Sequence, residues 1–253
     1  MTKVWSNLAA LVFVLGSTQF LAACNSTENN PEVPAGVSDG STLAPNTPDN
    51  PSPSPDPNEP GDPDPTPNPN PNAMTVAVKY VALQSEATSA PTPSKASVEA
   101  LIQNMSNAWA QCDIRFVLEE YIAPVASAHG VDFTPANHSQ LYDLRREFAD
   151  SRRALFVKTG TWDRSGNLGS DGSNGFSTMP GTEPTGVVFE SRVATSTLLL
   201  SHEAGHLIGG LGHTTTSTNL MNHYITSSTT RLTSSQCDYA RDTLVDHFSS
   251  WLR

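Results

Sequence analysis

Residues 202–213 read HEAGHLIGGLGH, and the rest of the chain has to fold around this stretch. His202 and His206 lie four positions apart, so on a helix their imidazoles project from one face and reach one metal ion at about 2.0–2.1 Å. Glu203 points about 100° around the helix, which places it to take a proton from a metal-bound water and not to bind the metal. Because zinc lowers the pKa of its bound water towards about 7, the pattern predicts a nucleophile at neutral pH.

The pattern continues beyond the two histidines. The stretch ends in His213, and Leu220-Met221 follows after a polar segment. The whole string resembles the metzincin clan of zinc endopeptidases, whose pattern is H-E-x-x-H-x-x-G-x-x-H followed by a methionine turn. In that clan a glycine lets the helix stop, so that a third histidine meets the metal. The resemblance implies one catalytic zinc ion, Glu203 as general base, Met221 as apolar floor beneath the metal, and three ligands, His202, His206 and His213.

One departure from the clan concerns the third ligand. His213 lies eleven positions after His202, whereas the clan has ten. We expect a glycine bulge near Gly209 and Gly210 to absorb the added residue, since glycine adopts conformations that other residues avoid. Packing is a poor explanation for three histidines and a glutamate within twelve residues. Other candidates for the third ligand remain open, namely His223, Asp238 and Asp242.

A second departure concerns a tyrosine. Some metzincins have a tyrosine two residues after the methionine and use it at the transition state. In this chain that position is His223, and Tyr224 follows one residue later. Tyr224 is therefore a candidate transition-state stabiliser without a firm role.

The order of predicted elements indicates the fold. Apolar periodicity predicts strands at 75–83, 113–119, 154–159 and 186–190, and helices at 94–111, 139–151, 194–208 and 234–252. Strands alternating with helices favour right-handed crossovers and a mostly parallel sheet. With the resemblance, this predicts an α+β, zincin-like fold: a mostly parallel twisted sheet with an antiparallel edge strand, an active-site helix and a small C-terminal helical subdomain.

Residues 160–185 are dense in Gly, Ser, Asn and Asp and are expected to form a loop. Such an oxygen-rich stretch is a weak candidate for binding Ca²⁺. Because it lacks the spacing of an EF-hand, a plain surface loop is the favoured interpretation.

Composition divides the chain of 253 residues into unequal parts. Residues 25–73 contain 14 of the 20 prolines, eight acids, no Lys or Arg and no aromatic residue. A segment with so little to bury cannot offset the entropy of folding, so we expect a disordered tether. The proline-rich run could instead be a ligand for a partner domain, but a spacer is favoured.

Residues 74–253 then form the catalytic domain, with a charge of -4 from 13 bases and 17 acids, against -11 for the chain. Neither part has a basic patch, so nucleic acid is not an expected partner.

The first 24 residues indicate export. Lys3 precedes an apolar run at 8–15 that is too short for a membrane span. The sequence Leu-Ala-Ala-Cys at 21–24 is similar to the lipobox of bacterial lipoproteins. This resemblance implies a signal peptide at 1–23, a lipidated Cys24 that begins the tether at 24–73, and a membrane partner. An ordinary secretory signal is the alternative. Asn25 favours the outer membrane of the bacterial cell envelope, and the membrane face stays open.

Two further cysteines remain if Cys24 bears lipid. In an oxidising compartment Cys112 and Cys237 can form one disulfide, which would link the first helix to the last and close a long loop. Two unpaired buried thiols are the alternative.

Together these patterns predict a membrane-tethered, monomeric zinc endopeptidase in which Glu203 activates a zinc-bound water. A peptide substrate would add as a strand along the sheet edge near 186–190. Two alternatives stay open. One is a zinc hydrolase acting on other amides, such as those of cell-wall material. The other is a non-catalytic adhesin or binding lipoprotein, whose added residue has spoiled the ligand set.

Overall fold

The computed structural model describes residues 72–86, 92–168 and 173–253. The predicted signal segment, Cys24 and all but the last two residues of the predicted tether lie outside the described residues. Among the helices of the described ranges, none is long and apolar enough to cross a membrane.

The described residues form one five-stranded sheet in the order β2-β1-β3-β5-β4. Strands β1, β2, β3 and β5 are parallel to their neighbours, and β4 runs antiparallel to β5 at the edge. The mostly parallel sheet with an antiparallel edge strand is therefore confirmed. The strands are β1 (Met74–Ala82), β2 (Ile114–Ile122), β3 (Ala154–Lys158), β4 (Gly175–Ser177) and β5 (Val187–Phe189).

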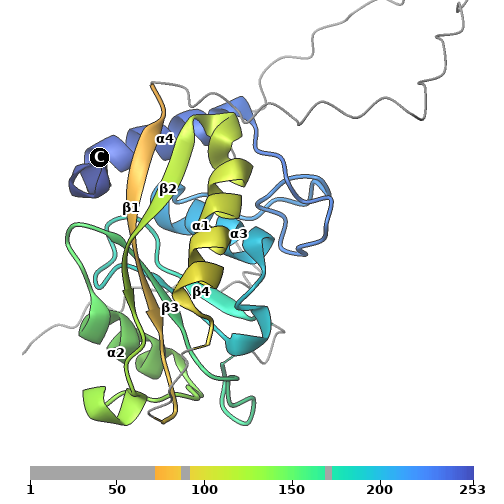
Figure 1. Cartoon of the computed structure of the whole chain (residues 1–253). Coiled ribbons are helices and arrows are strands. Elements are labelled where there is room, and N and C mark those ends of the chain that lie inside the picture. The colour runs from red at the N-terminus through yellow and green to blue at the C-terminus, as the bar shows by residue number, and fades with distance from the viewer. Residues whose placement is uncertain (1–71, 87–91, 169–172) are drawn as a thin grey trace, which may run out of the picture.

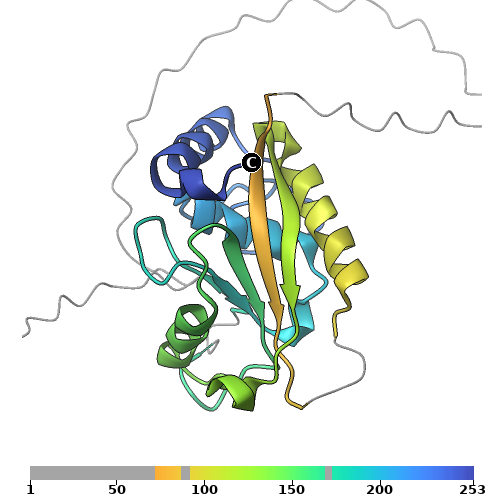
Figure 2. The same ribbon diagram turned by 60° about the vertical axis from the view of Figure 1, so that its left-hand side comes forward.

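Helices cover both faces of this sheet (Figure 1, Figure 2). Four α-helices connect or follow the strands: α1 (Lys95–Trp109), α2 (His138–Phe148), α3 (Thr197–Gly209) and α4 (Ser234–Phe248). Short 3₁₀ turns lie at Ala110–Cys112, Ala126–His129, Ser191–Val193 and Ser249–Trp251. Because parallel strands need a crossover on a face of the sheet, most strands are buried on both sides.

The interior strand β1 shows how alternating residues of one strand build two separate cores. Val76, Val78 and Tyr80 belong to the core beneath α1, α3 and α4. Val81 and Leu83 belong to the opposite core, beneath α2. Successive side chains of a strand point to opposite faces, so one apolar strand supplies both layers. The last residues of the chain return to this strand, where Arg253 N donates to Thr75 O at 2.9 Å.

Polar side chains fix where the helices begin. Ser94, Asn137, Ser196 and Thr233 are the N-caps, and each accepts a hydrogen bond from a backbone N–H of the first turn. The helix predicted at 194–208 therefore starts only at Thr197, after a short 3₁₀ turn. The helix predicted at 234–252 ends at Phe248, where a 3₁₀ turn replaces the last α-helical turn.

The strand predicted at 186–190 is present as β5, but the prediction that it lies at the edge of the sheet is wrong. β5 lies between β3 and β4, and the edge strand is β4, inside the stretch predicted to be loop. Three residues are too few to show a period in the sequence, and β4 exists because it pairs with β5 and buries Phe176. Part of the stretch considered as a weak candidate for Ca²⁺ binding, 169–172, lies outside the described residues.

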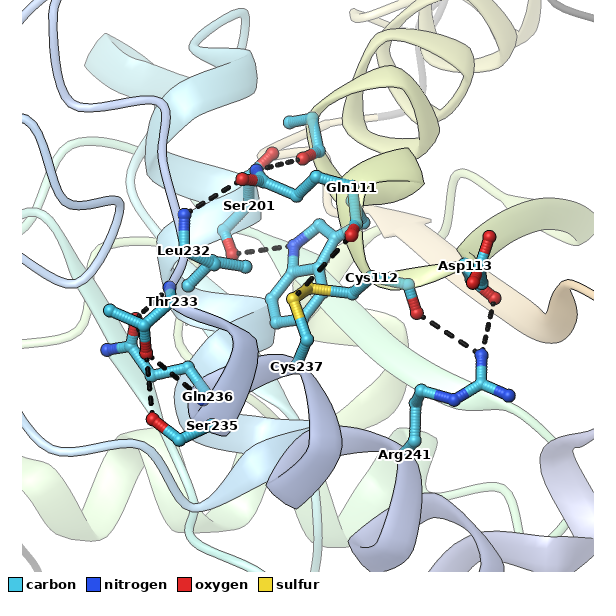
Figure 3. The surroundings of a disulfide bond; sticks show 12 residues. Gln111, Cys112, Asp113, Ser201, Leu232, Thr233, Ser235, Gln236, Cys237 and Arg241 are labelled. Atoms are coloured by element: carbon cyan, nitrogen blue, oxygen red, sulfur yellow. Dashed lines mark hydrogen bonds between the residues drawn. A yellow bond between two sulfur atoms is a disulfide. The ribbon is translucent and has the colours of Figure 1, made fainter.

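The structure contains the predicted disulfide between Cys112 and Cys237, which are 125 positions apart in sequence with their Cα atoms at 4.8 Å. The bond joins the turn after α1 to the first turn of α4. Figure 3 shows that Gln111, beside this bond, also reaches the segment before α4. Its Nε2 donates to Thr230 O at 2.9 Å, and its Oε1 accepts from Leu232 N at 2.9 Å. Crosslink and side chain together fasten this segment to α1.

Replacing Cys112 and Cys237 together by serine should lower the free energy of unfolding by about 2–4 kcal/mol, because the crosslink restricts a long loop of the unfolded chain. Urea unfolding followed by tryptophan fluorescence measures the change. A reductant should lower the wild-type midpoint to that of the double variant and leave the double variant unchanged. Equal midpoints for the oxidised wild type and the double variant would contradict this expectation.

Candidate metal centre

Helix α3 contains the first part of the site, namely His202, Glu203 and His206. All of its residues from Leu199 to Gly209 are buried, and it packs against α1, α4 and β4. Trp109 of α1 donates from Nε1 to Ser201 O at 3.1 Å. A helix that is apolar on all sides belongs in a core. His202 and Glu203 are accordingly 2% and 1% exposed, so any charge here is held away from water.

Three histidine nitrogens meet at one point of this core. The Nε2 atoms of His202 and His206 are 3.1 Å apart, and each lies 3.2 Å from Nε2 of His213. Tetrahedral ligands at about 2.0–2.1 Å from zinc lie about 3.3–3.4 Å from one another. Among the described residues, the group of His, Cys, Asp and Glu able to hold a metal consists of these three histidines. The donor set fits zinc with one coordination position left for a non-protein ligand.

The opposite ring nitrogens of His202 and His206 explain why their two Nε2 atoms favour a cation between them. Nδ1 of His202 lies 2.7 Å from Leu220 O, and Nδ1 of His206 lies 2.6 Å from Leu211 O. A carbonyl oxygen only accepts, so both Nδ1 atoms donate, and both Nε2 atoms bear lone pairs. Two acceptors at 3.1 Å repel each other unless a positive ion lies between them. The tautomers therefore favour a metal over a hydrogen-bonded histidine cluster.

Burial keeps these rings in the neutral form that binds metal. Desolvation lowers the pKa of His202 from 6.5 to about 4, although the hydrogen bond to Leu220 acts in the opposite direction. Burial also lowers the pKa of His206 well below its usual value, and that of His213 in the same direction. All three imidazoles are thus unprotonated at neutral pH, ready to coordinate a cation.

The added residue is absorbed at the end of α3. Gly210 has φ +54°, a left-handed conformation that favours glycine. Its N–H donates to His206 O at 2.9 Å, the bond of an αL-type helix end, and Leu211 N donates to Gly205 O at 3.2 Å. The same turn presents Leu211 O to the His206 ring. His213 then reaches the other two histidines despite its eleven-residue spacing from His202.

The segment containing Met221 lies beneath the helix. Met221 is fully buried, and a Cβ on Gly205 would lie 2.3 Å from its Sδ, so only glycine leaves room there. The neighbouring Leu220 accepts from His202 through its carbonyl and donates its N–H to Arg231 O at 2.6 Å. The methionine thus fills space below the ligands, and the backbone beside it orients one of them.

The remaining candidates lie outside the cluster. His223 is exposed, with its ring centre 6.3 Å from that of His213, and Asp238 and Asp242 are exposed on α4. None of these three belongs to the described metal-binding group. Tyr224 is 74% exposed and lies against the His223 ring, with centres 4.1 Å apart. Its role at a transition state stays a prediction.

Two residues of β4 contact Glu203 and were not anticipated from the sequence. The Ser177 hydroxyl donates to Glu203 Oε2 at 2.5 Å, and a Cβ on Gly175 would lie 2.6 Å from Glu203 Oε1. Alternation along a strand places residues 175 and 177 on the same face. A three-residue strand inside a glycine- and serine-rich stretch gives no signal that would identify them beforehand.

No protein-family model and no curated protein matches the sequence. Two solved structures that resemble this one are metalloproteinases. Metalloproteinase-II from Bacteroides fragilis has 16% identity and a TM-score of 0.45, over 67% of this chain and 53% of that chain. Tannerella forsythia mature mirolysin, in complex with a cleaved peptide, has 15% identity and a TM-score of 0.48, over 67% of this chain and 90% of that chain. The chain therefore spans about half the length of the first of these.

The ligand set can be tested by comparing two histidines. His213→Ala removes one of three converging nitrogens, so zinc affinity should fall by at least about 100-fold, whereas His223→Ala should change it by less than about threefold. Competition with a chromophoric chelator measures both values, and metal analysis should give one equivalent for the wild type. Equal losses in the two variants would favour His223 as a ligand.

Proposed function

We propose that the chain is a zinc-dependent endopeptidase, lipid-anchored in a bacterial outer membrane and separated from it by the tether. One observation supports the catalytic part of this proposal above all others. Three neutral imidazoles converge through Nε2, and Glu203, which follows His202 on α3, is a buried carboxylate that accepts a hydrogen bond from the edge strand β4. A structural zinc site closes all four positions with protein ligands, whereas a catalytic site leaves one open.

Zinc, when bound by His202, His206 and His213, supplies Lewis acidity for a scissile carbonyl and for an attacking water. Glu203 accepts the proton that the water loses as its oxygen attacks the carbonyl carbon. The same carboxyl then gives this proton to the leaving nitrogen as the carbon–nitrogen bond breaks. Burial suits this role, because bulk water does not screen the carboxylate.

The substrate in this proposal is an extended peptide that adds to the sheet at β4. This strand is the last in the described sheet and pairs with β5 on one side. Addition of a strand to a sheet edge uses main-chain hydrogen bonds and so accepts many sequences. The expected binding edge thereby moves from 186–190 to Gly175–Ser177, beside Glu203.

Glu203→Gln keeps the size of the side chain and removes its ability to accept the proton. Cleavage of an unstructured protein should fall by about 10²–10⁴-fold, with one equivalent of zinc still bound. Glu147→Gln, an exposed glutamate on α2, is the matched control and should leave the rate unchanged. The proposal fails if zinc-loaded wild type cleaves no peptide, or if a chelator does not stop the cleavage. Zinc binding without cleavage would favour the non-catalytic scaffold.

The location is tested separately through Cys24. Cys24→Ala removes the thiol that would bear the acyl chains, so the protein should leave the membrane fraction and appear in the soluble envelope fraction. Immunoblots of fractionated cells measure the distribution, and Cys112→Ala serves as a control for the loss of a cysteine. A Cys24→Ala protein that stays with the membranes would exclude anchoring through this residue.

A further inference from the structure

We infer that Gly175 and Ser177 form a seat on β4 that positions the carboxylate of Glu203 for proton transfer, an inference that rests on the proposed function. We call these two residues the carboxylate seat. Ser177 is 5% exposed, and its hydroxyl lies 2.5 Å from Glu203 Oε2 and 3.0 Å from Glu203 O. Gly175 lies against the other oxygen, Oε1, where a Cβ would be 2.6 Å away.

A helical glutamate needs such a contact because its side chain has three rotatable bonds. Helix geometry fixes the direction in which Glu203 leaves α3, but not the rotation of its carboxylate. A hydroxyl that binds Oε2 restricts this rotation, and in this proposal Oε1 accepts the proton. The absence of a side chain at Gly175 gives Oε1 its space. The two residues therefore select one orientation of the carboxylate among several.

The Ser177 hydroxyl can keep both of its contacts while Glu203 gains and loses a proton. It has one proton to donate and two acceptors within reach, the carboxylate and the backbone carbonyl of Glu203. When Glu203 holds the proton taken from water on Oε1, Oε2 can still accept from the Ser177 hydroxyl, and the hydroxyl stays within reach of the backbone carbonyl. No buried hydrogen bond is lost at either stage, so the carboxyl group need not turn during the reaction.

The rest of the fold holds the seat in place. Phe176 points to the opposite face, where its ring lies against the guanidinium of Arg145, 5.5 Å from the ring centre. Arg164 holds the backbone just before β4. It donates to Ser173 O at 2.9 Å and to the fully buried Glu190 at 2.6 Å. Glu190 N also donates to Asn174 O at 3.0 Å. A hydroxyl on a strand fixed from both sides is preorganised before substrate arrives.

Ser177→Ala tests the seat, and Ser106→Ala is the matched control. Ser106 is also a buried serine, 6% exposed, whose hydroxyl bonds the backbone of α1 and β2 far along the chain from the site. For the zinc-loaded full-length protein cleaving an unstructured peptide, Ser177→Ala should lower kcat about 10- to 100-fold with KM and zinc affinity within about threefold. Ser106→Ala should lower the unfolding midpoint without lowering kcat.

Gly175→Ala is the second variant, and it keeps the hydroxyl. Its added methyl should displace Oε1 and lower kcat at unchanged zinc affinity, so the seat stays testable if Ser177→Ala does not fold. Wild-type kcat in both variants would overturn the inference, and so would a kcat loss matched by an equal loss of zinc affinity.

A readout without metal separates the seat from the proposed function. In the metal-free protein, Ser177→Ala should destabilise the fold more when Glu203 is present than in a Glu203→Ala background, because the removed bond joins these two side chains. Urea unfolding of the four proteins gives this coupling. If the wild type cleaves nothing but the coupling is found, the contact stands and the peptidase proposal fails. Additive effects in the unfolding cycle would overturn the seat itself.

Discussion

Three imidazole Nε2 atoms converge to within 3.2 Å in the core, at least two of them bearing lone pairs, and the rest of the structure depends on holding them there. Such a cluster is unfavourable without a cation, and the folded chain must hold it in a neutral form against the repulsion. Burial of the three histidines lowers the pKa of each ring and so removes the competing proton. Two carbonyl groups then direct the rings by accepting from Nδ1. The metal site is thus a consequence of packing and backbone position, with few side-chain partners.

Those two carbonyls come from segments that follow the helix, and each is fixed by a different device. Leu211 O is placed by the left-handed turn at Gly210, which ends α3. Leu220 O belongs to a segment that bonds Arg231 through Leu220 N. The residues on either side of Arg231 are in turn held by Gln111, next to the Cys112–Cys237 disulfide. A covalent crosslink between two buried cysteines is therefore connected, by a short series of hydrogen bonds, to the orientation of a buried histidine.

The features that could be predicted from the sequence are those that depend on residues close together in the chain. Helix periodicity places His202 and His206 on one face, and the glycines predict an end to α3, because both effects act within a few residues. The parallel sheet is also predictable, since alternation of strands and helices leaves few topologies. Strand β4 is different, because three residues have no period and gain their structure from β5 and from the core beneath α2. Ser177 and Gly175 could not be connected with Glu203 for this reason, and the edge of the sheet was assigned to the wrong strand.

The metal ligands and the carboxylate of Glu203 are positioned by different segments of the chain. The ligands depend on the helix end at Gly210 and on the backbone around Leu220, whereas the orientation of Glu203 depends on the opposite side of α3, at β4. An added residue at the helix end therefore perturbs the path to His213 and leaves the carboxylate seat untouched. Conversely, a change in β4 can misplace the proposed base while the three histidines stay in position. The H-E-x-x-H pattern alone accounts for a candidate metal site, and the proposed role of Glu203 requires in addition a contact made by a strand more than twenty residues away in sequence.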